Sequence, residues 1–177
     1  LLDAASVAGA EPTAAAVAAA LASPADAVED ALVELTRRGG LVATRGADVW
    51  PDGTRTARFG FVHAMYQSVL YESLPPSRLR ALHQRIGERI ATAFATDPGE
   101  VAAELALHFE ASGDGARALP ACRQAGERAL ARHAYREAID HLERALAMLD
   151  DGARDAERAR TELDLRMRLG PALMAVH

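Results

Sequence analysis

His63 is the residue of this chain whose type and position best suit it to a chemical role. It follows a segment in which Phe59 and Phe61 alternate with small or apolar neighbours, and it opens a helical pattern that ends before Pro75. A histidine at such a junction can present a ring N–H to an anion, including a phosphate oxygen. The sequence therefore gives one candidate binding residue, His63, and the surrounding elements must determine what it faces.

No other residues form a catalytic or metal-binding pattern. Zinc sites use closely spaced ligands, whereas His63, His83 and His108 are far apart and Cys122 is the only cysteine. All 20 basic residues are arginine, so the chain lacks the lysine of a phosphate-binding loop and of a pyridoxal Schiff base. We therefore predict no catalytic residue, no metal site and no cofactor within this chain, and we interpret the chain itself as not an enzyme.

Composition narrows the class of protein further. Half of the 177 residues are hydrophobic and the formal charge is -5, which indicates a globular chain without a whole-chain basic field. A single cysteine suits a reducing compartment, and the longest apolar run, near residues 14–22, is too short to cross a bilayer. We predict a cytoplasmic protein that has no membrane contact.

Residues 1–74 have the element order of a winged helix. Helical patterns over residues 1–8, 13–21 and 24–38 precede a strand that begins near Leu41. The sequence Pro51-Asp52-Gly53 predicts a turn, and the return strand places Phe59 and Phe61 on one face. Three helices followed by one small β-hairpin predict a winged-helix-like domain over residues 1–74.

Residues 75–177 have a helical pattern throughout. The run from Tyr135 to Leu146 fits the second helix of a tetratricopeptide repeat, with Ala138, Leu142 and Ala145 at small, large and small positions. Gly126 lies where the first helix of such a repeat must be small. The predicted fold class is therefore mainly α, a winged-helix domain followed by a tetratricopeptide-like α-solenoid arm over residues 75–177.

DNA binding is the first alternative, because winged helices often read DNA. The second helix of a helix-turn-helix presents its first residues to the bases. Here the corresponding helix carries Asp26, Glu29, Asp30 and Glu34, and residues 1–40 hold six acidic and two basic side chains. Such a surface repels a polyanion, although Arg45, Arg55 and Arg58 on the hairpin could contact phosphates. We therefore expect no nucleic acid partner.

Two segments carry a resemblance to a known family. The start LLDAASVAGAEP and the run FGFVHAMYQSVLYESLPPSRLRALHQRIGERI, together with the alanine-rich repeats, resemble the region downstream of the ATPase core in bacterial STAND-type signalling ATPases. These include large adenylate-cyclase-linked and LuxR-type transcriptional regulators. The resemblance implies a regulatory segment of an ATP-binding parent protein. Its implied partners are the upstream ATPase core of the same polypeptide and a protein or small-molecule inducer at the repeat arm.

The resemblance also gives His63 a role. In related switches a histidine of the winged helix, within a Met-His-Asp-like motif, senses the β-phosphate of bound ADP. His63 occupies a similar place, but Val62 precedes it and Ala64 follows it, so the acidic partner is missing. The alternative for His63 is a partly buried histidine that caps the following helix.

We expect this chain to be an interior part of a longer protein. It begins with Leu1-Leu2 in the middle of a helical pattern and stops at His177 directly after another helical segment. A stand-alone tetratricopeptide scaffold for peptides is the second alternative.

Overall fold

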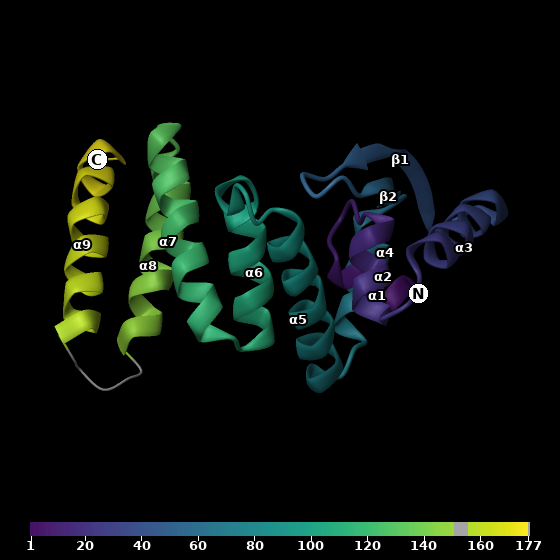
Figure 1. The fold of residues 1–177 in the computed structure, drawn as a ribbon, viewed down its shortest axis with the longest axis horizontal. Helices are drawn as coiled ribbons and strands as arrows, with labels where there is room; N and C mark the ends of the chain where they lie inside the picture. The colour runs from purple at the N-terminus through teal and green to yellow at the C-terminus, as the bar shows by residue number, and fades with distance from the viewer. Residues whose placement is uncertain (151–155, 177) are drawn as a thin grey trace. The chain divides into compact units, whose positions relative to one another are not determined.

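A computed structural model describes residues 1–150 and 156–176 of the chain (Figure 1). The chain is mainly helical, at 72%, with one small antiparallel hairpin, which confirms the predicted mainly α class. Contacts between residues divide it into two compact units. The N-terminal unit comprises Leu1–Thr96 with Ala111–Gly113, and the C-terminal unit comprises Asp97–Glu110 with Asp114–His177.

The sequence pattern changes at residue 74, but the N-terminal compact unit continues to Thr96. Helix α5 (Pro76–Ala93) packs on α2 (Ala14–Leu21) and belongs to the N-terminal unit. It buries Leu82, Ile86 and Ile90 along one stripe. The predicted domain boundary marks the end of strand and turn signals, whereas the compact units follow side-chain packing.

The N-terminal unit begins with three helices, and residues at their ends explain where two of them start or stop. Thr13 caps α2 by accepting from the backbone N–H of Ala16 at 3.3 Å, and Gly39 ends the third helix with a positive φ of 79°. Such a φ favours glycine because it has no Cβ. The three helices are α1 (Leu2–Val7), α2 and α3 (Ala25–Arg38).

The hairpin that follows is built as predicted and is extended by a segment that was not predicted. Strands β1 (Val42–Val49) and β2 (Arg55–Phe61) pair antiparallel, and Phe59 and Phe61 are buried. On its other side, β2 pairs with the connection between α1 and α2. The Phe59 N–H donates to the Pro12 carbonyl at 2.9 Å, and the Phe61 N–H donates to the Ala10 carbonyl at 3.3 Å.

The tip of the hairpin is attached to α5 by one arginine. The Arg89 guanidinium lies 4.7 Å from the ring centre of Trp50 and donates to Asp52 Oδ2 at 2.9 Å and to Thr54 Oγ1 at 2.6 Å. Trp50 is buried and its ring also meets that of Phe94. The position of the hairpin on α5 is therefore fixed by stacking and hydrogen bonds together.

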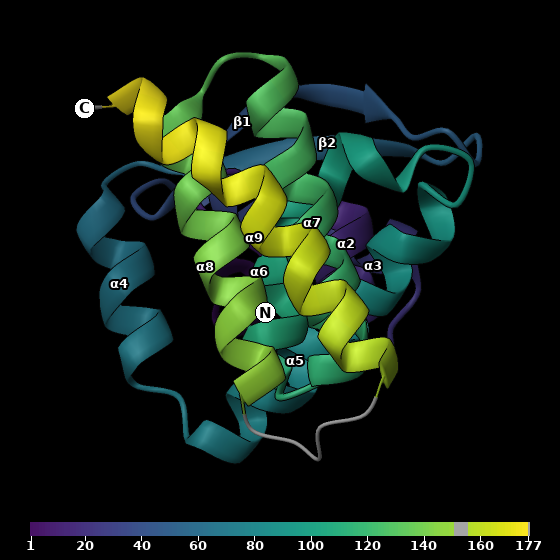
Figure 2. The same cartoon turned by 90° about the vertical axis from the view of Figure 1, so that its left-hand side faces the viewer.

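The C-terminal unit is a series of helices joined by short connections. Its 3₁₀ turn η1 (Pro98–Val101) leads into α6, and Asp114 caps α7 by accepting from the Arg117 N–H at 3.1 Å. Helix α8 lies between α7 and α9, and Figures 1 and 2 show these three helices side by side. The helices of this unit are α6 (Ala102–Ser112), α7 (Gly115–Ala131), α8 (Tyr135–Asp150) and α9 (Ala156–Val176).

The close helix crossing predicted at Gly126 is confirmed. A Cβ placed on Gly126 would lie 2.8 Å from Cγ of Leu142 and 3.5 Å from the carbonyl oxygen of Ala138. The 3.5 Å distance is an ordinary contact, but at 2.8 Å either Leu142 or the helices would have to move, so glycine suits this close approach of α7 and α8. Leu142, Ala138 and Ala145 are fully buried.

Within residues 1–150 and 156–176, no helix combines the length and the apolar character needed to cross a membrane.

Candidate interaction surface

Helix α4 (Ala64–Glu72) exposes two large apolar side chains to solvent, together with the polar Ser68 and Glu72. No residue of α4 is buried. On its inner side, Gln67 Nε2 donates to the Ser6 carbonyl at 3.1 Å, and the Tyr71 hydroxyl lies 3.0 Å from His83 Nε2. On its outer side, Met65 is 67% exposed and Val69 is 59% exposed. Surface helices usually bury their large apolar side chains, so Met65 and Val69, one turn apart and both exposed, mark a place where α4 can make a further contact.

A groove adjoins this helix. It has a volume of about 550 Å³, and α1, α3 and α4 contribute its walls. Its charged groups are already paired, because Asp3 binds Arg78 at 3.3 Å and Glu34 binds Arg38 at 2.8 Å. The groove therefore offers a mainly apolar floor. The lining residues are Leu1, Leu2, Asp3, Ala31, Glu34, Leu35, Arg38 and Leu70.

We call the outer face of α4 and this groove together the α4 surface, defined by Met65, Val69 and the groove residues. Leu70 joins its two parts, since it belongs to α4 and lines the groove. Both parts lie in the N-terminal unit.

His63, the predicted site residue, lies at the beginning of α4 and is exposed. It occupies the N-cap position through its backbone, whose carbonyl accepts from the Tyr66 N–H at 3.0 Å. Its side chain makes no capping hydrogen bond, and its ring meets the Tyr66 ring edge-on, with centres 5.4 Å apart. The alternative of a partly buried capping side chain is therefore not what the structure shows. The role of His63 in sensing a phosphate stays a prediction.

The buried histidine His83 holds α4 on α5. It is 2% exposed, and its contact with Tyr71 joins the two helices. Burial lowers the pKa of His83 below its ordinary value, because the charged imidazolium loses its hydration. A neutral ring at this position suits the hydrogen bond with the tyrosine hydroxyl.

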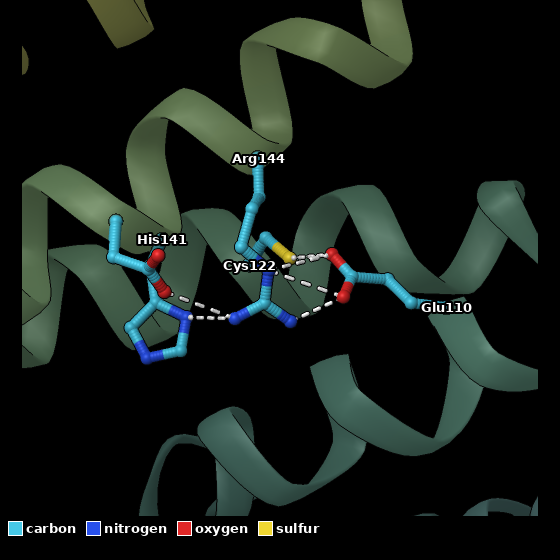
Figure 3. Close-up of polar contacts among 5 residues, drawn as sticks. Glu110, Cys122, His141 and Arg144 are labelled. Atoms are coloured by element: carbon cyan, nitrogen blue, oxygen red, sulfur yellow. Dashed lines mark hydrogen bonds and ion pairs between the residues drawn. The ribbon is translucent and has the colours of Figure 1, made fainter.

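The C-terminal unit contains a second polar cluster, formed around Arg144 of α8 (Figure 3). Arg144 Nε lies 3.1 Å from both carboxylate oxygens of Glu110 in α6, and a further nitrogen of the guanidinium also donates to Glu110. The Cys122 thiol of α7 donates to Glu110 Oε1 at 3.0 Å, and His141 Nδ1 lies 3.5 Å from Arg144 Nη1. One carboxylate thus joins side chains of three helices.

The pKa of the Cys122 thiol indicates that this cluster has a structural role and that the thiol is not a nucleophile. Burial, followed by the hydrogen bond to Glu110, raises the pKa of the Cys122 thiol to about 12. A thiol with that pKa is protonated at neutral pH, whereas nucleophilic cysteines need a lowered pKa. The hydrogen bond to Glu110 raises the pKa of Arg144, and burial lowers the pKa of His141.

In the part of the chain that the structure describes, no group of three or more His, Cys, Asp or Glu side chains could hold a metal ion. Comparison of the chain with protein-family models, with curated proteins and with solved structures finds no match. The interpretation of this surface therefore depends on the geometry of the chain itself.

The sequence pattern pointed to His63, which precedes α4, but did not reveal the α4 surface. The signal was present: Met65 and Val69 are four residues apart, and Tyr71 and Gln67 are also four residues apart, on the other side of the same helix. Periodicity shows that a helix has two faces. It does not show which face is turned inward when the inner contacts are hydrogen bonds.

Proposed function

We propose that this chain is a non-catalytic regulatory and interaction segment of a larger ATP-dependent signalling protein. In this proposal a winged-helix domain docks on the ATPase core of the same polypeptide, and a tetratricopeptide-like arm receives a protein or small-molecule inducer. The observation that carries the proposal is the α4 surface, an exposed apolar helix face beside an apolar groove. Its release from the core would be the switch, a change between two packed states biased by ligand.

Two details of the fold support the finer architecture. In the N-terminal unit, the connection between α1 and α2 forms backbone hydrogen bonds with β2. It thereby lies beside the hairpin as a short third extended segment, as in a winged helix. In the C-terminal unit, Leu142 of α8 packs against Gly126 of α7, which is the contact expected of a tetratricopeptide helix pair. Both details are local contacts within one unit.

His63 fits this proposal by its place. It begins the helix that carries Met65 and Val69, so a protein surface that covers α4 passes close to its exposed ring. If that surface holds ADP, the imidazole can donate to a phosphate oxygen. The ATP or ADP would belong to the core, and this chain would contribute the sensing side chain.

The contacts of the hairpin arginines disfavour the DNA-binding alternative. Arg58 is bound to Asp48 at 2.9 Å through Nε and lies 3.6 Å from Glu11. Arg45 lies across Gly60, where an added Cβ would be 2.6 Å from its Nε. Arg58, one of the three arginines expected to contact phosphates, is therefore paired within the hairpin region, whereas Arg45 is exposed. Asp26 and Asp30 are exposed on α3.

The test is binding of this chain to the separately expressed ATPase core from the same polypeptide, measured by calorimetric titration. Met65→Glu and Val69→Glu place a charge in the apolar contact, so each should weaken binding about tenfold or more. Val49→Glu is the matched control, because Val49 is 70% exposed on β1, away from α4. Equal affinities for all three variants and the wild type would overturn the proposal.

A further inference from the structure

Helix α4 is held in the N-terminal unit by contacts that bury little of its surface. None of its nine residues is buried. Gln67 Nε2 donates to the Ser6 carbonyl at 3.1 Å, and the Tyr71 hydroxyl lies 3.0 Å from His83 Nε2 on α5. Segments that bury few apolar side chains open locally at a lower free energy than the core of a domain. Helix α4 is therefore an element that can open while the rest of its unit stays folded.

The contact between Tyr71 and His83 suits a neutral imidazole. The two rings meet edge-on, with centres 5.8 Å apart, and His83 is 2% exposed. Either neutral tautomer can take part, because Nε2 then accepts the hydroxyl proton or donates to the hydroxyl oxygen. A protonated ring can only donate, and it brings a full charge to a site shielded from water. Burial accordingly lowers the pKa of His83.

The carboxylates on the elements that contact α5 are already paired. Asp3 of α1 binds Arg78 of α5 at 3.3 Å, and Asp52 at the hairpin tip binds Arg89 of α5 at 2.9 Å. Helix α2 consists of alanine, valine and leucine, so it carries no ionisable side chain. In this described part of the chain, these elements therefore offer no unpaired carboxylate to offset an imidazolium at His83.

The ionisable side chains within α4 and α5 offset such a charge poorly. Both carboxylates, Glu72 and Glu88, are exposed, and water weakens their attraction for a buried cation. The arginines of α5 are positive themselves and oppose it. The remaining ionisable residues here are Arg80 and Arg85 on α5, Tyr66 on α4, and His63 at its N-cap.

We propose that the Tyr71–His83 contact is a pH-sensitive switch, in which protonation of His83 releases α4 from α5 while the rest of the N-terminal unit stays folded. Once α4 opens, water reaches the Nε2 side of the ring, which then binds a proton more readily than in the docked state. Acid therefore favours the open state. An open ring with the ordinary pKa of 6.5 limits the gain in opening at pH 5.0 to about thirtyfold.

The switch is a property of this chain alone, so its test needs no ATPase core. Amide hydrogen exchange at pH 7.5 and pH 5.0, divided by the intrinsic rate at each pH, gives a protection factor for every segment. The protection factor of α4 should fall by up to about thirtyfold between the two pH values. At both pH values α4 should be less protected than α2, which lies in the same unit.

Urea separates local opening of α4 from unfolding of the whole unit. Local opening exposes little surface, so about 0.5 M urea should leave exchange of α4 unchanged and accelerate that of α2. Equal protection of α4 and α2, with the same response to urea, would mean that α4 opens only when the unit unfolds. That result would overturn the proposal.

His83→Gln removes the titrating ring, so the protection factor of α4 should become equal at the two pH values. His141→Gln is the matched control. His141 is also a buried histidine whose pKa burial lowers, but it lies on α8 in the C-terminal unit. Its substitution should leave the pH dependence of α4 as in the wild type. A wild-type pH dependence of α4 in His83→Gln would overturn the proposal.

Tyr71→Phe tests the same contact from the side of α4, and it serves even if His83→Gln fails to fold. The loss of the hydroxyl removes the 3.0 Å contact with His83, so α4 should be about twofold to tenfold less protected at pH 7.5. Unchanged protection of α2 would show that the unit remains folded. If α4 is as protected in Tyr71→Phe as in the wild type, this contact does not hold the helix and the proposal fails.

Discussion

At the residue scale, Arg144 shows how much of a contact the sequence can predict. Its spacing from Asp140 predicts an ion pair on the surface of α8, and the two groups are 3.2 Å apart. The same guanidinium also binds Glu110, which lies 34 residues earlier in another helix. Spacing along one helix cannot reveal a partner on a different helix, so it predicts the exposed pair with Asp140 and misses the contact that joins α6 to α8.

His83 makes the stability of the chain depend on pH. Burial lowers the pKa of its imidazole below the ordinary value of 6.5, so the folded state binds a proton less readily than the unfolded state. Stability is therefore complete above pH 6.5 and is lost as the pH falls below it. His141, whose pKa is lowered by burial and then by Arg144, contributes in the same direction.

We predict that His83→Gln reduces this loss. The free energy of unfolding, from urea titrations at pH 7.5 and pH 5.0, should differ less between the two pH values in His83→Gln than in the wild type. Tyr71→Phe is the control, since it removes the 3.0 Å contact with His83 but keeps the titrating ring. An equal pH dependence in His83→Gln and the wild type would show that His83 is not a source of the acid sensitivity.

At the scale of elements, the sequence predicted most of the helices and the hairpin because their ends carry local signals. Thr13 and Asp114 accept hydrogen bonds at helix starts, and Pro51 to Gly53 form the hairpin turn. The pairing of Pro12 with Phe59 carries no such signal, since it joins residues distant in sequence through backbone groups alone. The outward face of α4 escaped prediction for a related reason, because its inner contacts are hydrogen bonds.

Gly126 and Gly170 allow one substitution to be compared on two helices. Gly126→Leu should destabilise the chain by about 1–3 kcal/mol, because the new side chain meets Leu142 at the closest crossing of α7 and α8. Gly170→Leu meets nothing within 4 Å and should leave stability equal or slightly higher.

Urea denaturation midpoints of both variants, measured at low chain concentration, check this difference. If Gly126→Leu unfolds at the wild-type midpoint, the register assigned to α7 and α8 is wrong. The comparison is matched because the same side chain is added to a helical glycine in each case.

At the scale of the whole molecule, the two units present different surfaces. The N-terminal unit exposes the α4 surface, and the C-terminal unit exposes Leu163, Met167 and Met174 of α9. The two sets of residues belong to different units, so a substitution in α9 is a control for binding through α4. Met65→Glu should weaken binding to an ATPase core, whereas Met167→Glu should leave it unchanged.

His63→Ala in the full-length protein tests the switch itself. The exposed ring of His63 makes no capping hydrogen bond, so its removal should change the stability of this chain by less than about 0.5 kcal/mol. If the ring donates to an ADP phosphate oxygen in the parent, its loss should cost about 1.5–3 kcal/mol of ADP binding, roughly a tenfold to hundredfold effect.

Stopped-flow release of a fluorescent ADP analogue would show this as faster dissociation, accompanied by higher signalling without inducer. His133→Ala is the matched control, because His133 is also exposed and lies in the C-terminal unit. Unchanged ADP release in His63→Ala, together with a lower melting temperature of this chain, would assign His63 a structural role. Faster release at unchanged stability would instead indicate a contact outside this chain, because the His63 side chain is exposed and makes no capping hydrogen bond.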